Sequence, residues 1–179
     1  GDITTPEKAL AVLRHTGADA IMIGRAAQGR PWIFGDIAHF LATGQHRAAP
    51  LTQQVKQWLL AHLGEHYGLY GEFAGVRTAR KHIGWAVRAL PGGEAFRTRM
   101  NALDSCEAQV QAVADYFDEL SLDHDRLPAA AVDVAEDDDA LELRPLQQPD
   151  AERELLRLRL AREGPRVVLQ VPPPHWGAP

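Results

Sequence analysis

Two glycines in this sequence are placed where a phosphate group could approach the main chain. Gly24 ends the apolar run of residues 20–23 and is followed by Arg25, and Gly1 is followed by Asp2. A glycine has no Cβ, so a ligand can come close, and an arginine can add a charge-assisted hydrogen bond. In a (β/α)8 barrel, the loops after the last two strands commonly bind phosphate in this way. The pattern alone leaves two interpretations open: a phosphate site, or ordinary tight turns with a surface arginine.

A second group of charged residues follows one predicted helix. Between residues 75 and 101 six residues are basic, whereas Glu94 is the only acidic one. A basic stripe within a chain of net charge -5 suits contact with a nucleic-acid backbone, although a solvated helix face is the alternative. His82 and Trp85 lie near these basic residues in the sequence and could stack on a base. A tryptophan at helical spacing, however, is usually a core residue. The residues predicted to contact RNA are Arg77, Arg80, Lys81 and Arg88.

The sequence predicts no metal site. His62 and His66 are four residues apart, so they would share one helix face and could hold one ion. No HExxH motif is present and no third ligand is evident, which favours core or surface histidines. Cys106 has no visible partner for nucleophilic catalysis and is interpreted as a packing residue.

Composition sets the class of protein. The chain has 179 residues, of which 45% are hydrophobic, so it can form one domain with a modest appendage. A single cysteine fits a reducing compartment, and no apolar run approaches the roughly 18 residues that a membrane span requires. No secretory signal pattern opens the sequence. We therefore expect a cytoplasmic protein without a membrane segment.

Residues 1–24 are predicted to form half of a βαβ unit. Thr5 and Pro6 are typical of a helix start, and Gly17 is typical of a helix end. The apolar run of residues 18–23 predicts a short buried strand of a parallel sheet. A further helix is expected between Pro31 and Gly44.

Residues 46–121 are predicted to form a small helical bundle. Apolar periodicity indicates a helix near residues 55–67, a second over 72–90 and a third over 94–103. Asp104 is predicted to cap a fourth helix, with Glu107 three residues later. Acidic and proline-rich residues dominate 122–179, so we expect a disordered or loosely attached tail.

These motifs together resemble one known family. "TGADAIMIGRAAQGRPWIF" at residues 16–34 is followed by "HYGLYGEFAGVRTARKHIGWAVRALPGGEAFRTRMNAL" at 66–103 and by "CEAQVQAVADYF" at 106–117. From Gly1 to about Leu120, the sequence closely resembles the C-terminal part of bacterial tRNA-dihydrouridine synthases of the B-type branch. No such resemblance is found for residues 122–179.

The resemblance implies an α/β segment followed by an all-α segment. Residues 1–45 would be the C-terminal end of an FMN-binding TIM (β/α)8 barrel, 46–121 a helical tRNA-binding domain, and 122–179 the tail. Gly24 and Arg25 would hold the flavin phosphate after the eighth strand, and Gly1 and Asp2 after the seventh.

The resemblance also implies a reaction. In this family NADPH reduces FMN, the flavin passes hydride to C6 of a tRNA uracil, and a cysteine on a mid-barrel loop protonates C5. Cys106 lies in the wrong domain for that role, so no catalytic residue is predicted in this chain. We expect a C-terminal piece of a longer polypeptide, inactive alone, from a family whose members are usually monomers without protein partners.

Two other functions remain open at this point. One is a free-standing helical RNA-binding module without catalysis. The other is a phosphate-binding barrel enzyme that acts on a small molecule, against which the basic helix and the "PGGEAFR" turn argue.

Overall fold

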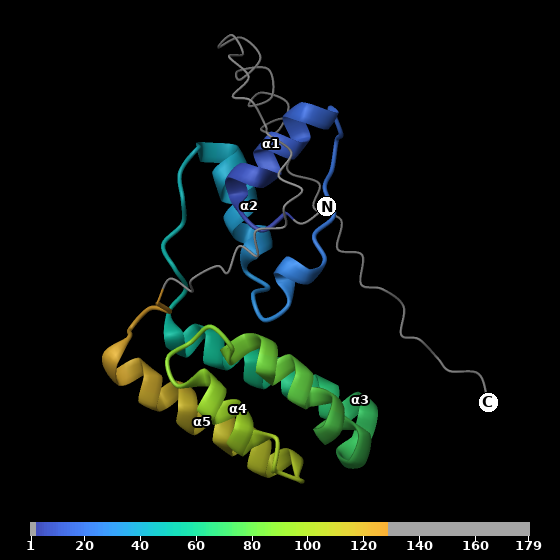
Figure 1. Ribbon diagram of the computed structural model, residues 1–179, viewed down its shortest axis with the longest axis vertical. Coiled ribbons are helices and arrows are strands. Elements are labelled where there is room, and N and C mark those ends of the chain that lie inside the picture. The colour runs from blue at the N-terminus through green and yellow to red at the C-terminus, as the bar shows by residue number, and fades with distance from the viewer. Residues whose placement is uncertain (1–2, 129–179) are drawn as a thin grey trace, which may run out of the picture. The chain divides into compact units, whose positions relative to one another are not determined.

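The fold of this chain is taken from a computed structural model, which describes residues 3–128 (Figure 1). The described residues are mostly helical. They divide into two compact units, the first made of residues 3–27 and 32–47, the second of residues 28–31 and 48–128. No helix among them has the length and apolar character needed to span a bilayer.

The first helix of the first unit begins and ends where the sequence predicts. α1 spans Pro6–Thr16, with Pro6 in the first turn. The Thr5 hydroxyl accepts a hydrogen bond from the Lys8 amide at 3.2 Å, which satisfies one of the free N–H groups of the first turn. Gly17 ends the helix in the left-handed conformation, with φ of 65°. The predicted boundaries of this helix are confirmed.

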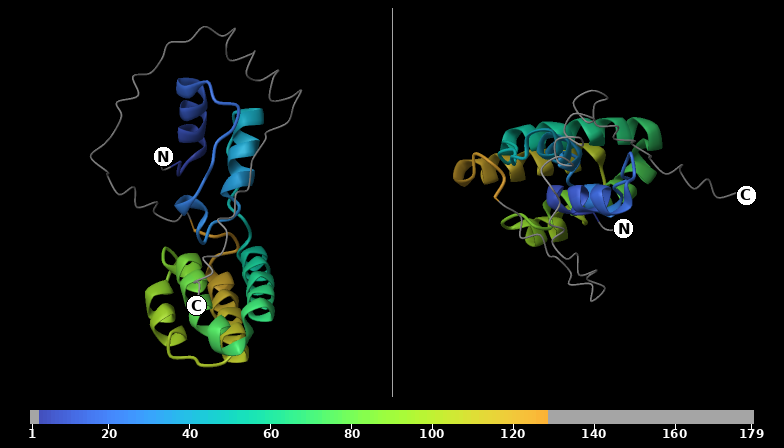
Figure 2. Two further views of the ribbon diagram at one scale, coloured as in Figure 1. Left: turned by 90° about the vertical axis from the view of Figure 1, so that its right-hand side faces the viewer. Right: turned by 90° about the horizontal axis from the view of Figure 1, so that it is seen from above.

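The first unit contains one further α-helix and a small apolar core. α2 spans Ile33–Thr43, and a 3-10 turn, η1, covers Arg25–Ala27. Figure 2 shows α1 and α2 side by side in this unit. Their contact buries Ile3, Ala9, Ile33 and Ile37.

The predicted strand over residues 18–23 is not formed. Ile21 and Ile23 pack against the core while Met22 is 64% exposed, so the segment has the alternation of an extended chain. A strand also requires a neighbour that completes its hydrogen-bond ladder, and none is present among residues 3–128. The described residues up to 45 are therefore helical with one extended connection, and the α/β assignment of residues 1–45 stays a prediction.

The second unit is built around a helix that reverses direction. α3 spans Thr52–Val87 but is interrupted at Gly71, whose φ of 69° and ψ of 177° are not helical. Figure 1 shows the two arms of α3, residues 52–70 and 72–87, turning back on each other. The two helices predicted from the sequence on either side of this glycine are confirmed.

Two shorter helices pack against α3. α4 spans Gly93–Met100 and α5 spans Cys106–Asp123, which continues beyond the predicted domain boundary. The predicted Asp104 cap of α5 is wrong by one residue, because the Ser105 hydroxyl accepts the hydrogen bond from the Ala108 amide. The Asp104 carboxylate instead lies 3.4 Å from the guanidinium of Arg80.

Two segments at opposite ends of this unit are hydrogen-bonded to each other. Leu51 and Arg126 form an antiparallel bridge, the Thr52 amide donates to the Asp125 carbonyl at 2.9 Å, and the Leu127 amide donates to the Pro50 carbonyl at 3.1 Å. We call the pairing of residues 49–52 with 124–127 the clasp. It joins the start of α3 to the end of α5.

One buried polar side chain joins α5 to both arms of α3. Gln109 is fully buried, donates to the Val76 carbonyl at 3.2 Å, and accepts from the Tyr67 hydroxyl at 2.8 Å. Burial, with a smaller contribution from Cys106, raises the pKa of Tyr67 to about 12, so its hydroxyl remains a donor. A buried polar group is stabilising only while its partners are present.

Replacing Gln109 tests this arrangement. Gln109→Ala leaves the Tyr67 hydroxyl without an acceptor in the core and removes the side-chain bond to the Val76 carbonyl, so we expect the free energy of unfolding to fall by about 2–3 kcal/mol. Gln111→Ala is the matched control, because Gln111 is exposed on the same helix and bonds only to Asp115. Urea unfolding followed by circular dichroism measures both, and equal effects would contradict the role given to Gln109.

Candidate nucleic-acid interface

A basic hollow of about 380 Å³ lies on the second unit between α3 and α4. Three of the four arginines and lysines predicted to contact RNA line it, and Arg77 does not. Its lining residues are Arg80, Lys81, Gly84, Trp85, Arg88, Arg97 and Asn101. We call this site the basic hollow.

The lysine of the hollow is positioned by an aromatic ring. The Lys81 ammonium lies 4.9 Å from the centroid of the Trp85 ring, within the range of a cation–π interaction. Trp85 is only half-buried, so part of its ring remains available to a ligand. A cation beside an aromatic surface is the arrangement with which single-stranded nucleic acids are bound.

Arg80 combines a structural role with its place in the hollow. Its guanidinium donates to the Leu103 carbonyl at 3.1 Å and to Asp104 at 3.4 Å, which ties α3 to the loop between α4 and α5. Its Nε is buried without a hydrogen-bond partner. Arg80 therefore lines the hollow as a fixed charge.

Arg97 was not among the predicted RNA contacts. Its guanidinium pairs with the Glu94 carboxylate at 2.9 Å. Its side chain also packs against Gly84, where an added Cβ would lie 3.4 Å from the Arg97 Cδ. Residues 13 apart in sequence become neighbours only when α4 packs on α3, so helical spacing could not reveal this pairing. The preceding "PGG" turn was the one available signal, because it predicts a reversal after α3.

Arg77 lies outside the hollow, nearer the reversal of α3. Its guanidinium carbon is 5.6 Å from the ring centroid of Phe73, which is 80% exposed. This pair presents a second cation beside an accessible ring. The predicted face therefore divides into a hollow and one separate position.

The predicted flavin-phosphate residues are only partly described. Gly24 and Arg25 are exposed in the first unit, whereas Gly1 and Asp2 lie outside the described residues. Gly24 does not have a positive φ, and an added Cβ would meet nothing within 4 Å. The fold of the described residues does not itself require a glycine there, and the main chain is open to a ligand.

A different glycine of the same motif is required by the fold. Gly29 has φ of 73°, and a Cβ at this position would collide with the main-chain carbonyl of Trp85. Residues 28–31 thus pack closely against the end of α3, next to a residue of the basic hollow.

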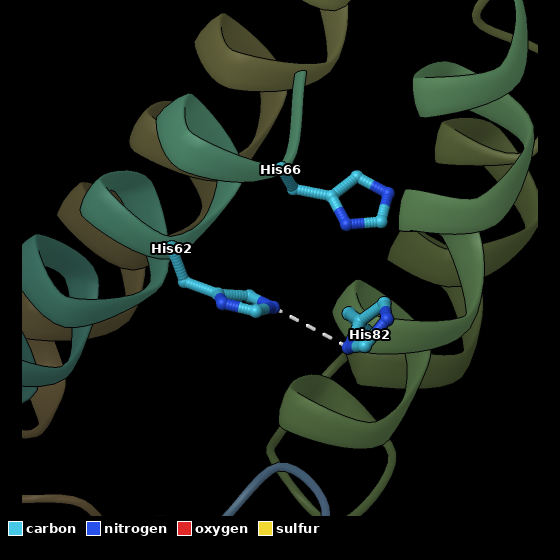
Figure 3. A group of neighbouring side chains, drawn as sticks. All are labelled: His62, His66 and His82. Atoms are coloured by element: carbon cyan, nitrogen blue, oxygen red, sulfur yellow. Dashed lines mark hydrogen bonds between the residues drawn. The ribbon is translucent and has the colours of Figure 1, made fainter. Parts of the chain in front are cut away.

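Three histidines come together on α3, although the sequence suggested only two. The His62 and His82 rings approach to 3.4 Å between nitrogens, and the His66 and His82 ring centroids are 5.2 Å apart (Figure 3). Burial, with smaller effects from His62, His66 and Lys81, lowers the pKa of His82 to about 4. Burial and His62 also lower the pKa of His66.

Cys106 has the environment of an unreactive thiol. Burial and the nearby Glu72 carboxylate raise the pKa of its thiol, which disfavours the nucleophilic thiolate. Its amide donates to the same carboxylate at 3.3 Å.

Comparison with known proteins identifies the family. The family model described as dihydrouridine synthase (Dus) matches residues 1–121. The chain is 54% identical over 119 residues to tRNA-dihydrouridine synthase B of Pseudomonas putida, covering 66% of this chain and 35% of that protein. It is 52% identical over 120 residues to the protein of that name from Xanthomonas axonopodis pv. citri, covering 67% and 36%.

A third relative is matched over a similar length of the chain. The chain is 48% identical over 122 residues to tRNA-dihydrouridine synthase B of Serratia marcescens, covering 68% of this chain and 36% of that protein. The chain belongs to the dihydrouridine synthase family, as the sequence resemblance predicted. It spans about a third of the length of these curated relatives.

The two glycines of the motif give a prediction with an internal control. Gly29→Ala forces a strained backbone and a collision with Trp85, so we expect it to lower the free energy of unfolding by about 1–3 kcal/mol or more. Gly24→Ala makes the same chemical change in open space and should alter the free energy by less than about 0.5 kcal/mol. Urea unfolding of both variants would contradict this account if Gly24→Ala were the more destabilising.

Proposed function

We propose that this chain is the part of a tRNA-dihydrouridine synthase that holds the tRNA and contributes to the cofactor-phosphate site. The observation that carries the proposal is the basic hollow, which four cationic side chains and a half-exposed tryptophan line in a chain of net charge -5. Membership of the family supplies the substrate class and the reaction, uridine to 5,6-dihydrouridine in tRNA.

The charges of the hollow suit the backbone of a folded RNA. Lys81, Arg88 and Arg97 would bind phosphate oxygens, and each contact would release condensed counterions. Arg80 is fixed by its bonds to Leu103 and Asp104, so it would lose little conformational freedom on binding. The Trp85 ring would stack on a base, a contact that tolerates different sequences.

The residues at the end of the extended segment suit a flavin phosphate. Gly24 leaves its main chain open, and Arg25 is an exposed guanidinium that can bind phosphate oxygens. Gly1 and Asp2 are proposed to contact the same phosphate from outside the described residues. FMN, with NADPH as its reductant, would supply the hydride that reduces the uracil ring.

The roles of the remaining residues follow from this assignment. No catalytic residue is assigned to this chain, and Cys106 is left with a packing role because of its raised pKa. Residues 46–121 act as the tRNA-binding domain, and the protein acts in the cytoplasm, where its tRNA substrate is found.

Binding of tRNA to the chain tests the hollow. Arg88→Ala should weaken binding, and the slope of log K against log salt should fall by about 0.7–0.9, the change expected for one lost phosphate contact. Arg99→Ala is the matched control, because Arg99 is exposed on α4 but does not line the hollow. Gel-shift titrations at several salt concentrations distinguish the two variants, and an unchanged slope for Arg88→Ala would remove the hollow from the interface. Arg77→Ala in the same series shows whether the interface extends to the reversal of α3.

A chimera tests the cofactor assignment. We would replace the corresponding segment of the Pseudomonas putida tRNA-dihydrouridine synthase B with residues 1–121 of this chain. Arg25→Ala in the chimera should reduce the flavin retained after purification at least about tenfold, since it removes a charge-assisted hydrogen bond. Arg14→Ala at the end of α1 should retain as much flavin as the parent chimera. Flavin absorbance per protein measures this, and equal retention in both variants would exclude Arg25 as a phosphate ligand.

A further inference from the structure

Three histidine side chains from the two arms of α3 converge on one space. His62 and His66 lie one turn apart on the first arm, and His82 lies on the second (Figure 3). One ring nitrogen of each lies within 4.8 Å of the corresponding nitrogens of the other two. The reversal at Gly71 is what brings residues from opposite arms together.

The spacing of these nitrogens is close to that of a metal site. Two imidazole nitrogens bound to one tetrahedral Zn²⁺ ion at 2.0–2.1 Å are about 3.3 Å apart. The His62 Nε2 and the His82 Nδ1 are already 3.4 Å apart. The remaining separations are no longer than 4.8 Å, so small side-chain rotations would complete the set.

The hydrogen bond made by His66 selects the nitrogen that it can offer. Its Nε2 lies 2.7 Å from the Thr78 hydroxyl, which already donates its own proton to the Ala74 carbonyl at 2.8 Å. Because that hydroxyl has only one proton, it must accept from Nε2–H of His66. The lone pair of His66 therefore resides on Nδ1. Metal-bound histidines are commonly oriented in this way, with the second ring nitrogen donating to a fixed acceptor.

We propose that His62, His66 and His82 bind one divalent transition-metal ion, of which Zn²⁺ is the natural choice, with water as the fourth ligand. Imidazole nitrogens suit Zn²⁺, Ni²⁺ and Cu²⁺, whereas Mg²⁺ and Ca²⁺ require oxygen ligands. His62 is exposed, so an ion can enter from solvent. The rings of Tyr70 and Trp85 lie 4.7 Å from His66 and 5.3 Å from His82, and they form part of the wall.

An ion at this position would join the two arms of α3. It would fix the second arm next to Lys81 and Trp85, which line the basic hollow. The metal site itself is inferred from the histidine geometry and does not depend on the proposed function.

Zinc titration of the full chain, prepared without a histidine tag, tests the site. Isothermal calorimetry should show one Zn²⁺ bound per chain, and Co²⁺ should give the intense visible absorption of a tetrahedral complex. His62→Ala and His82→Ala should each weaken binding at least about 100-fold. Thr78→Val should weaken it about tenfold, within the range found when a group that orients a ligand is removed.

The control is His15→Ala, which removes an exposed histidine from α1 and should leave zinc affinity unchanged. Circular dichroism checks that each variant is folded, and the exposed His62 keeps the test valid if His82→Ala disturbs the core. The proposal is overturned if the chain binds no zinc, if His62→Ala binds as tightly as the parent, or if His15→Ala weakens binding equally.

Discussion

The second unit depends on the reversal of α3 at one residue. Gly71 has a combination of φ and ψ that is essentially restricted to glycine. Without this break, a continuous helix of 36 residues would be about 54 Å long, and His66 and His82 would be separated by about 24 Å along its axis. The reversal instead creates a pair of arms that α4 and α5 can cover, with Gln109 bonded to both arms.

The sequence predicted a helix well where the residues at its two ends determine those ends locally. Thr5, Pro6 and Gly17 define α1 by local hydrogen bonds and backbone preference, and these do not depend on distant residues. The prediction of a strand over residues 18–23 was wrong for the opposite reason. A strand forms only with a hydrogen-bonded neighbouring strand, which local sequence does not specify. The cap of α5 lies one residue later than predicted, at Ser105, and the Asp104 carboxylate lies beside Arg80, which is distant in sequence.

The candidate site could be predicted only along one helix. Periodicity placed Lys81 and Arg88 on a common face, but it could not show that α4 would bring Arg97 to the same hollow. The third histidine was missed in the same way, because the spacing of His62 and His82 has meaning only across the turn at Gly71. Charge density was therefore visible in the sequence, whereas the shape that concentrates it was not.

The clasp has a consequence for how this module can be joined to other segments. Because residues 49–52 pair with 124–127, the chain enters α3 and leaves α5 at neighbouring points. The two ends of this segment of about 75 residues lie as close together as the ends of a short loop. Such a module can be inserted, exchanged or enlarged without changing the distance between the segments that carry it. A pulling force applied at its two ends would also load the few hydrogen bonds of the clasp before it reached the helical core.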